Sequence, residues 1–426
     1  MNTFYYAIAL ILLAFLGAPL FSIIGAIGLI AFSAADIDTS AMIVELYRLA
    51  NTPTLLAIPL FTFAGYILAE SKTPLRLVAL SKAFFGWIPG GLAIVTLVSC
   101  AVFTAFTGAS GVTIIALGGL LYPILIKENY AEKFSLGLLT TSGSLGLLFP
   151  PSLPIILYGL VAKISIDKLF VAGFIPGILL MLALGFYSVR HGIKAHVPKI
   201  PFAWKNVYSA LRGAIWELPL PFVIIGGIYG GWFTATEAAA ITAFYVLIVE
   251  VFMYKDLALF SDVPRIMKES MVLVGAILII LGCALGLTNY LIDEEVPMKL
   301  FAFIREMIQS KFVFLILLNI FLLIVGMMMD IFSAIIVVVP LIIPIATAYN
   351  VDPVHLGIIF LTNLEIGYLT PPVGLNLFIS SFRFEKPVTQ VVQATLPYIG
   401  ILLIALIFIT YMPELSLWLV NLLNVK

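Results

Sequence analysis

Two apolar stretches of this chain contain backbone that could bind ions and carboxylates. Residues 146–154 and 367–375 each carry a double proline. Proline removes a backbone donor and clashes with the carbonyl one turn back, so a helix does not continue through the pair. A broken helix leaves carbonyl oxygens that suit a hard cation such as sodium, and amide groups that suit a carboxylate. In lipid, paired breaks in the two halves of a chain are typical of a transporter's binding site.

Small and polar residues gather beside both breaks, and several of them would act through backbone oxygen. In the first half these candidates are Thr104, Thr107, Gly108 and Ser110, facing Ser142, Ser144, Gly146, Phe149 and Pro151. In the second half they are Gly326, Met329, Asp330 and Ser333, facing Thr362, Asn363, Gly367, Thr370, Val373 and Asn376. Because backbone oxygens carry much of the expected chemistry, the side chains need not look like ligands.

Some of the polar residues have a structural alternative. Ser142 and Ser144 could instead bond back to their own helix. Asp330 is a carboxylate at membrane depth, where a functional role is the default expectation. Glu365 is a candidate proton or cation partner, with a pore-facing or donor-paired position as the alternative. Glu237 follows Thr234 near a helix start, so capping is the favoured interpretation.

The two halves resemble one another in sequence. An offset of 221 residues aligns nine positions, most of them Pro, Gly, Asn or Thr: Leu120, Pro123, Ile124, Asn129, Thr141, Gly146, Leu148, Pro150 and Pro151 pair with Leu341, Pro344, Ile345, Asn350, Thr362, Gly367, Leu369, Pro371 and Pro372. A second offset, of 223, aligns residues 72–77 with 295–300. The pattern indicates an internal duplication rather than a chance match between two apolar stretches.

Composition places the chain in a membrane. The 426 residues are 62% hydrophobic and 10% charged, with a mean hydropathy of +1.18, which is typical of a polytopic all-α membrane protein. The net charge of zero argues against a nucleic-acid partner. The two cysteines and three histidines form no cluster with metal-site spacing, so we expect no zinc, haem or organic cofactor. We expect no cleavable signal peptide.

Hydropathy predicts ten full crossings and two re-entrant helical hairpins. The crossings lie near 3–17, 19–35, 53–70, 131–162, 170–189, 215–232, 234–253, 269–291, 355–381 and 394–420. Residues 92–125 and 312–346 are each too long for one crossing. Each contains a cluster of small or polar residues, at 107–111 and 326–330. We expect both hairpin tips to stop partway across the bilayer. Residues 35–51 and 297–309 are expected to be interfacial helices.

Basic residues orient the chain. Segments 72–90, 127–133, 189–214, 254–268 and 382–393 together carry 15 of the 22 Lys and Arg residues, which predicts that they are cytoplasmic. Both termini are then periplasmic, and the two hairpins enter from opposite sides. The prediction is an inverted structural repeat of about ten transmembrane helices, with two re-entrant hairpins and two broken helices.

The predicted domain scheme follows from this repeat. The first repeat is 1–189, with scaffold helices in 1–90, a hairpin at 92–125 and a broken helix at 131–162. A cytoplasmic linker occupies 190–214, and the second repeat is 215–426, with a scaffold at 215–311, a hairpin at 312–346, a broken helix at 355–381 and a last helix at 394–420. The hairpins and broken helices form a transport (elevator) domain beside the scaffold.

Four motifs carry a resemblance to a known family. Residues 104–111 (TAFTGASG), 143–153 (GSLGLLFPPSL), 233–239 (FTATEAA) and 370–375 (TPPVGL) resemble signatures of the DctM-like large membrane subunit, the M subunit, of TRAP (tripartite ATP-independent periplasmic) transporters. The resemblance covers the whole chain. It implies a sodium-driven importer of the ion-transporter superfamily that works by an elevator motion in a bacterial or archaeal inner membrane. It also implies a four-helix, DctQ-like small membrane subunit and a DctP-like periplasmic substrate-binding protein that delivers an organic acid.

The resemblance also implies two sodium sites. The first involves Thr104, Thr107, Gly146, Phe149 and Pro151, and the second involves Gly326, Met329, Gly367, Thr370 and Val373. The internal repeat relates the two sets. Thr104 and Thr107 stand where the family pattern leads us to expect serines, and they keep the hydroxyl. Phe149 and Met329 could contribute only carbonyl oxygens, which leaves the ion's identity less defined than its position.

Between the two hairpin tips we expect an anion site that sodium completes. Its candidate substrate residues are Ser110, Ser142, Ser144, Asp330, Asn363 and Asn376. The expected cargo is a C4-dicarboxylate or a related acid, such as sialic acid or a keto acid. One alternative is a sodium- or proton-coupled carboxylate carrier that works without a binding protein. A membrane enzyme is disfavoured because the sequence shows no nucleophile paired with a base. A purely structural scaffold is also disfavoured, because it would not explain four symmetric interruptions of the backbone.

Overall fold

The computed structural model describes residues 5, 9–10, 12–13, 16, 18–194, 201–230 and 232–423, and every regular element within them is a helix. The first half contains α2 (Leu20–Ala34), α3 (Ser40–Ala50), η1 (Pro53–Leu56), α4 (Ala57–Glu70), α5 (Thr73–Phe85), α6 (Gly91–Thr107), α7 (Ser110–Thr113), η2 (Ile114–Gly118), α8 (Gly119–Lys127), α9 (Glu132–Ser142), η3 (Leu145–Leu148), α10 (Leu153–Ala162) and α11 (Ile166–Lys194). The second half contains α12 (Trp204–Gly213), α13 (Pro219–Tyr229), α14 (Ala235–Ile248), η4 (Val249–Met253), α15 (Asp262–Asp293), α16 (Val296–Met307), α17 (Lys311–Met328), α18 (Ile331–Ala348), α19 (Pro353–Gly367), α20 (Leu375–Phe384), α21 (Val388–Tyr411) and α22 (Glu414–Leu422).

Local sequence signals explain where several helices begin. Thr234 and Glu237 form a reciprocal capping box at the start of α14, which confirms the capping interpretation of Glu237. Asp330 caps α18 and Asp352 caps α19, each carboxylate accepting two backbone N–H bonds. Proline at the first turns of α5, α10, α13 and α19 loses no helical hydrogen bond there, since the first amides have no partner within the helix.

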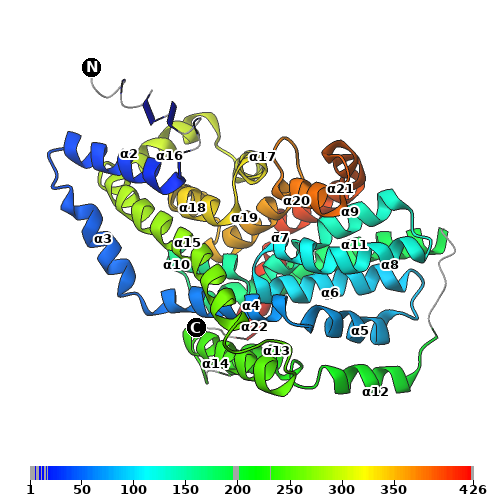
Figure 1. The fold of residues 1–426 in the computed structure, drawn as a ribbon. Helices are drawn as coiled ribbons and strands as arrows, with labels where there is room; N and C mark the ends of the chain where they lie inside the picture. Colours follow the sequence, from blue (N-terminus) through cyan, green and yellow to red (C-terminus); the bar gives the residue numbers. More distant parts are fainter. Residues whose placement is uncertain are drawn as a thin grey trace.

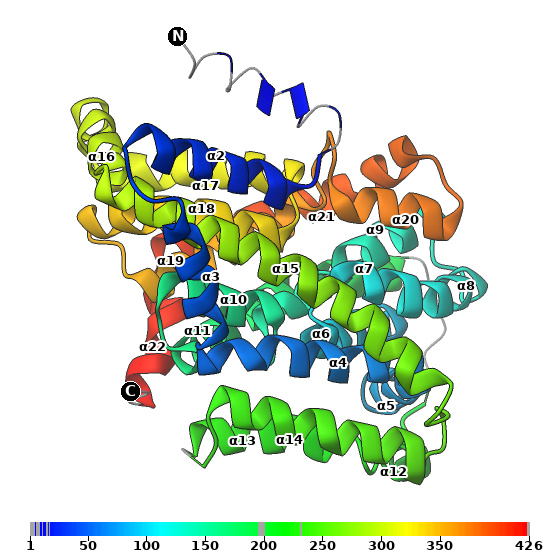
Figure 2. The same cartoon turned by 60° about the vertical axis from the view of Figure 1, so that its left-hand side comes forward.

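The long helix α15 runs beside helices from the first half of the chain (Figure 1). It packs against α2, α3 and α4, and α4 also packs on α14. Figure 2 shows α12, α13 and α14 as a separate layer along one edge of the molecule. On the other side, α11 packs against α6, α19 and α21, while α9 packs on α21 and α17 packs on α19. Helices from the two halves are therefore interleaved rather than folded as separate units.

Both expected hairpins consist of two helices joined by a two-residue turn. The arms α6 and α7 meet at Gly108 and Ala109, and Gly108 adopts the left-handed conformation that glycine allows without strain. The arms α17 and α18 meet at Met329 and Asp330. The second arm of the first hairpin contains a π-helical turn, η2. Each hairpin therefore has its tip within the predicted cluster of small or polar residues.

Both broken helices are broken where the double prolines stand. In the first, α9 ends at Ser142, η3 follows, and α10 starts at Leu153. In the second, α19 continues to Gly367 and α20 starts at Leu375. The first break spans 143–152, includes η3 and has Phe149 in an extended conformation. The second break spans 368–374 and contains no regular element. The two halves repeat the architecture but differ in where the helix stops.

Length and composition support membrane insertion. Among the described residues, eight helices are long and apolar enough to cross a membrane, and the pair Glu132–Leu148 and Leu153–Ala162, bent by 44°, makes up to nine. The eight include α17, α18 and the arm 110–127, so these hairpin arms have the length of a full crossing. That the tips stop partway remains a prediction. The expected crossing at 3–17 lies largely outside the described residues.

Three expectations about the helices need correction. The last helix, expected at 394–420, is two helices, because the chain turns at Met412 and Pro413 and proline has no amide with which to continue a helix. Within the linker 190–214, residues 204–213 form the amphipathic helix α12. Residues 73–85, which lie outside every predicted crossing in a segment expected to be cytoplasmic, form helix α5.

Candidate functional site

The first hairpin tip lies directly against the first helix break. The Thr104 hydroxyl donates a hydrogen bond of 2.8 Å to the Gly143 carbonyl and lies 2.6 Å from the Thr113 hydroxyl. A methyl group at Gly146 would lie 2.2 Å from the Ala101 carbonyl oxygen. Such a separation is far below a van der Waals contact, so only glycine allows η3 to approach α6 this closely. The structure therefore brings Thr104 and Gly146 of the predicted first sodium site together.

The second hairpin makes the same kind of approach to the second break. A methyl group at Gly367 would lie 2.6 Å from the Gly326 Cα. The Gly374 amide donates to the Met327 carbonyl at 3.1 Å, and the Ile331 amide donates to the Tyr368 hydroxyl. Backbone thus packs against backbone on both sides of the repeat. Gly326 and Gly367 of the predicted second sodium site are in direct contact.

The remaining members of both predicted sodium sites lie on these same segments. Phe149 and Pro151 lie in the first break, and Met329 lies at the second tip in an extended conformation. Thr370 lies in the second break, where its hydroxyl donates to the Ile366 carbonyl at 3.0 Å. Val373 is exposed. An extended or irregular backbone leaves carbonyl oxygens unpaired within the helix, which is the donor type that a hard cation prefers.

Buried hydroxyl groups without a partner distinguish the first site. Thr107, Thr141 and Ser152 each have a side-chain oxygen with no hydrogen-bond partner within the described ranges, and all three residues are fully buried. An unpaired buried hydroxyl costs roughly 1–3 kcal/mol, so such groups are rare without a role. Oxygen donors of this kind, beside freed carbonyls, fit a sodium ion. Thr107 belongs to the predicted set, whereas Thr141 and Ser152 do not.

Side chains from both halves meet beside the first hairpin tip. Ser110 donates to the Asn376 side-chain carbonyl at 2.7 Å, and the Asn376 amide reaches the Thr140 carbonyl at 3.4 Å. The Thr140 hydroxyl in turn lies 2.9 Å from that of Ser380. Ser110 and Asn376, both candidate substrate residues, are thus brought together although 266 positions separate them. Thr140 and Ser380 had no distinguishing sequence signal apart from their proximity to the breaks.

The other candidate substrate residues are engaged elsewhere. Ser142 and Ser144 donate to carbonyls three residues back, at 3.4 and 3.3 Å, which is the back-bonding alternative. The Asn363 amide donates to the Asn319 side chain at 2.6 Å, on the side of α19 that faces α17. The Asp330 carboxylate accepts from the Phe332 and Ser333 amides at 3.0 Å.

Glu365 is buried within α19. Its side chain has no exposed surface, and both carboxyl oxygens lack a hydrogen-bond partner within the part of the chain that the structure describes. A carboxyl group in that position is costly unless an unseen partner or a proton accompanies it. Its role as a proton or cation partner stays a prediction.

The glycine contacts yield a direct test. We expect Gly367→Ala to separate α17 from α19, because its methyl group would overlap the Gly326 backbone, and to lower both the thermal stability and the transport rate. Gly400→Ala in α21 is the matched control, since no atom lies within 4 Å of its added methyl group. It should be neutral or stabilise the protein by about 0.5–1 kcal/mol. Melting curves of the purified variants measure both effects, and an unchanged Gly367→Ala protein would contradict the contact.

Comparisons with known proteins identify the family of this chain. The family model for the DctM component of tripartite ATP-independent periplasmic transporters matches residues 4–415. The C4-dicarboxylate TRAP transporter large permease protein DctM of Pseudomonas aeruginosa is 37% identical over 401 residues, covering 93% of this chain and 92% of the relative. An ectoine and 5-hydroxyectoine TRAP large permease of Ruegeria pomeroyi is 32% identical, covering 97% of both chains.

A solved structure supports the fold. The Alcanivorax borkumensis YdaH transporter, described as having an unusual topology, superposes with a TM-score of 0.66 and covers 89% of each chain at 13% identity. An all-α membrane fold is therefore shared with a known transporter. With the family match over nearly the whole chain, the conclusion is that this protein belongs to the DctM family of TRAP transporter large permeases, and that it is a membrane transport protein rather than an enzyme.

Proposed function

We propose that this chain imports a small organic acid across the inner membrane and uses a sodium gradient to drive the import. The observation that carries the proposal is the duplicated contact between a hairpin tip and a helix break, at Thr104 with Gly146 and at Gly326 with Gly367. Two such contacts, related by the internal repeat, create two clusters of backbone carbonyl oxygens, each of which has a second lone pair available beyond its turn hydrogen bond. Binding a cation at each cluster would hold the tips in place and complete a site between them.

The proposed sodium ions bind at the two sets predicted from the sequence. Freed carbonyls in the breaks and the buried Thr107 hydroxyl, which lacks a partner, are oxygen donors of the required kind. Thr141 and Ser152 are added as candidates for the first site for the same reason. Sodium would neutralise the negative ends of the interrupted helices before the acid binds.

Alternating access would occur by an elevator motion of the hairpins and broken helices past α2–α4 and α13–α15. A close approach between these two groups supports this division. Gly65 in α4 faces the end of α6, where an added methyl group would lie 2.5 Å from the Phe106 carbonyl oxygen. Because glycine presents no side chain there, the tip of the first hairpin has a smooth surface along which to move.

The proposed substrate is an acid held largely by neutral groups. Ser110 and Asn376 lie between the first tip and the start of α20, whose free amide end favours a carboxylate. The relatives are named for C4-dicarboxylates, ectoine and isethionate, which are all small and carry an acidic group. A C4-dicarboxylate or a similar carboxylate is therefore the proposed cargo of this chain.

The proposed assembly contains a small membrane subunit and a periplasmic substrate-binding protein. The family description specifies a tripartite transporter, and one relative is named as a joint DctMQ permease. Exposed apolar side chains on the outer helices leave surface for a membrane partner or for lipid.

Reconstitution tests the coupling and the assembly. In proteoliposomes, uptake of the acid should require an inward sodium gradient, the small subunit and the loaded binding protein. Replacing sodium by potassium at equal ionic strength should reduce the initial rate to background. Uptake that continues undiminished without sodium would contradict the coupling, and uptake without the binding protein would favour the simpler carrier.

Thr370→Leu tests the second sodium site. Leucine removes the hydroxyl and adds apolar bulk within the break, so we expect sodium-driven uptake to be abolished with normal amounts of protein in the membrane. Thr347→Leu is the control, because Thr347 makes the same type of bond to its own helix, at 2.8 Å, but lies exposed on α18. Normal uptake by Thr370→Leu would remove this residue from the site.

Ser110→Ala tests the anion site. Losing one hydrogen-bonding hydroxyl should weaken substrate binding by about tenfold, because a net hydrogen bond contributes about 1 kcal/mol and more to a charged group. The change should appear as a higher KM at unchanged sodium dependence. Ser188→Ala in α11, which removes a buried hydroxyl that bonds its own helix at 2.8 Å, is the control. An equal KM for both variants would exclude Ser110 from the site.

A further inference from the structure

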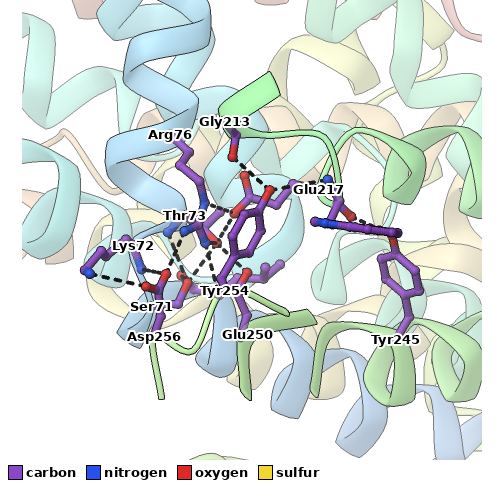
Figure 3. Close-up of polar contacts among 12 residues, drawn as sticks. Ser71, Lys72, Thr73, Arg76, Gly213, Glu217, Tyr245, Glu250, Tyr254 and Asp256 are labelled. Carbon is purple, nitrogen blue, oxygen red and sulfur yellow. Dashed lines mark hydrogen bonds and ion pairs between the residues drawn. The ribbon is translucent and has the colours of Figure 1, made fainter. Parts of the chain in front are cut away.

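A buried arginine joins the two halves of the chain outside the proposed transport site. Arg76 in α5 contacts three carboxylates: Nε lies 2.6 Å from Glu217, one terminal nitrogen lies 2.8 Å from Glu250, and the other lies 2.6 Å from Asp256 (Figure 3). The three acids come from the turn before α13, from η4 and from the loop that follows it. Their side chains are 5%, 0% and 4% exposed. One guanidinium therefore holds three separate segments of the second half.

An aromatic side chain completes the enclosure of Arg76. The guanidinium carbon lies 3.8 Å from the ring centroid of Tyr254, a cation–π contact. The Tyr254 hydroxyl donates to the Gly213 carbonyl at 2.8 Å, and Tyr245 donates to the Trp216 carbonyl at 2.7 Å. These bonds hold the chain just before Glu217 and help to keep its carboxyl group against Arg76.

The buried charges do not balance. Three carboxylates face one guanidinium, and among the described residues the only other cation with a contact is Lys72, whose ammonium lies 3.4 Å from Asp256 and whose side chain is 69% exposed. Counting Lys72 in full still leaves one negative charge in excess. An uncompensated charge in a buried site is strongly destabilising, so a further positive charge is required.

The hydrogen bonds are also one donor short. The Thr73 hydroxyl lies 2.6 Å from the Glu217 Oε1 and 3.2 Å from the Glu250 Oε1, but it has a single hydrogen to donate. The Glu217 Oε2 is buried and has no hydrogen-bond partner among the described residues. The two carboxyl groups therefore converge on one hydroxyl, and an ionised carboxylate has no hydrogen of its own to donate. A proton on one of the two carboxyl groups would supply the missing donor.

We propose that Glu217 and Glu250 form a proton-binding site in which the two carboxyl groups share one bound proton. This single proton supplies both the missing positive charge and the missing donor. Asp256 does not take part, because Arg76, the Lys72 amide and the Lys72 ammonium already serve its oxygens. The groups that face the shared proton are Arg76 and Thr73 from α5 and Tyr254 from the loop after η4.

Two cavities adjoin this site. A cavity of about 340 Å³ lies between α5 and α12 and is lined by Arg76, Lys82, Asn206 and Ser209 among others. A second cavity, of about 260 Å³, is lined by Thr73, Glu217 and otherwise almost wholly apolar side chains. The polar cavity reaches the cluster at Arg76, while the apolar cavity keeps the polarity around Glu217 low.

The pKa directions of Glu217 and Asp256 agree with this assignment. Burial raises the pKa of Glu217, against the opposing effects of the Thr73 hydrogen bond and the Arg76 charge. Burial would also raise the pKa of Asp256, but the hydrogen bonds from Arg76 and the Lys72 amide lower it below its ordinary value. A carboxyl whose pKa is raised by folding stabilises the folded state below its unfolded pKa. That stabilisation is lost as the pH rises through the folded pKa.

Melting temperatures of the full chain in detergent, measured from about pH 5 to about pH 8.5, test the site. Glutamine imitates a protonated glutamic acid, so Glu250→Gln should match the unsubstituted protein at the acidic end. At the alkaline end the variant should melt several degrees higher, because it cannot lose the proton. Glu217→Gln should show the same trend and serves if Glu250→Gln fails to fold.

Asp256→Asn is the matched control, since it removes one carboxylate from the same arginine. It should lower the melting temperature by a similar amount across this whole pH range, because Asp256 is ionised throughout it. The inference is overturned if both glutamine variants behave like Asp256→Asn. A second measurement is the infrared C=O band of protonated carboxylic acids. The part of this band that disappears between the acidic and the alkaline end should be smaller in Glu250→Gln than in the unsubstituted protein. An equal loss in both proteins would also overturn the inference.

Discussion

The contact of main chain with main chain at the two helix breaks is the constraint on which the rest of the transport region depends. At Gly146 and Gly367 the break lies so close to the neighbouring hairpin helix that even a methyl group would overlap it. That proximity leaves little room for side chains between tip and break, so the lining consists of backbone oxygen and amide groups with a few hydroxyl groups such as that of Thr104. The apolar composition around these points keeps water out and strengthens every electrostatic interaction that the freed groups make.

The ionic cluster around Arg76 is not repeated at the corresponding position of the second half, Lys299. The offset of 223 pairs Arg76 with Lys299, but the Lys299 ammonium donates to the Glu294 carbonyl at an exposed position. The inverted halves therefore share their hairpins and breaks while differing in how their outer helices are fastened. One end of the scaffold is fixed by a buried ionic cluster, and the corresponding end of the other half relies on apolar packing of α16 on α18.

Much of the fold could be predicted because its signals are local. Double prolines mark the breaks, clusters of small or polar residues mark the tips, and Thr234 with Glu237 marks a helix start. The site was predictable only in part. Which side chains meet across the repeat, such as Ser110 with Asn376, depends on the packing of helices far apart in sequence. For the same reason the cluster around Arg76 could not be foreseen, because its acids lie more than 140 positions away and read as ordinary residues near helix ends.

The two hairpins are attached to their breaks in different ways. In the first, the Thr104 side chain donates to the Gly143 carbonyl. In the second, the Tyr368 side chain accepts from the Ile331 amide, and the Gly374 amide also donates to the Met327 carbonyl. A bond from a side chain changes when the residue changes, but a main-chain bond persists through most substitutions. Evolution can therefore retune the first attachment through Thr104, while the second keeps a main-chain bond that is inherited with the fold itself.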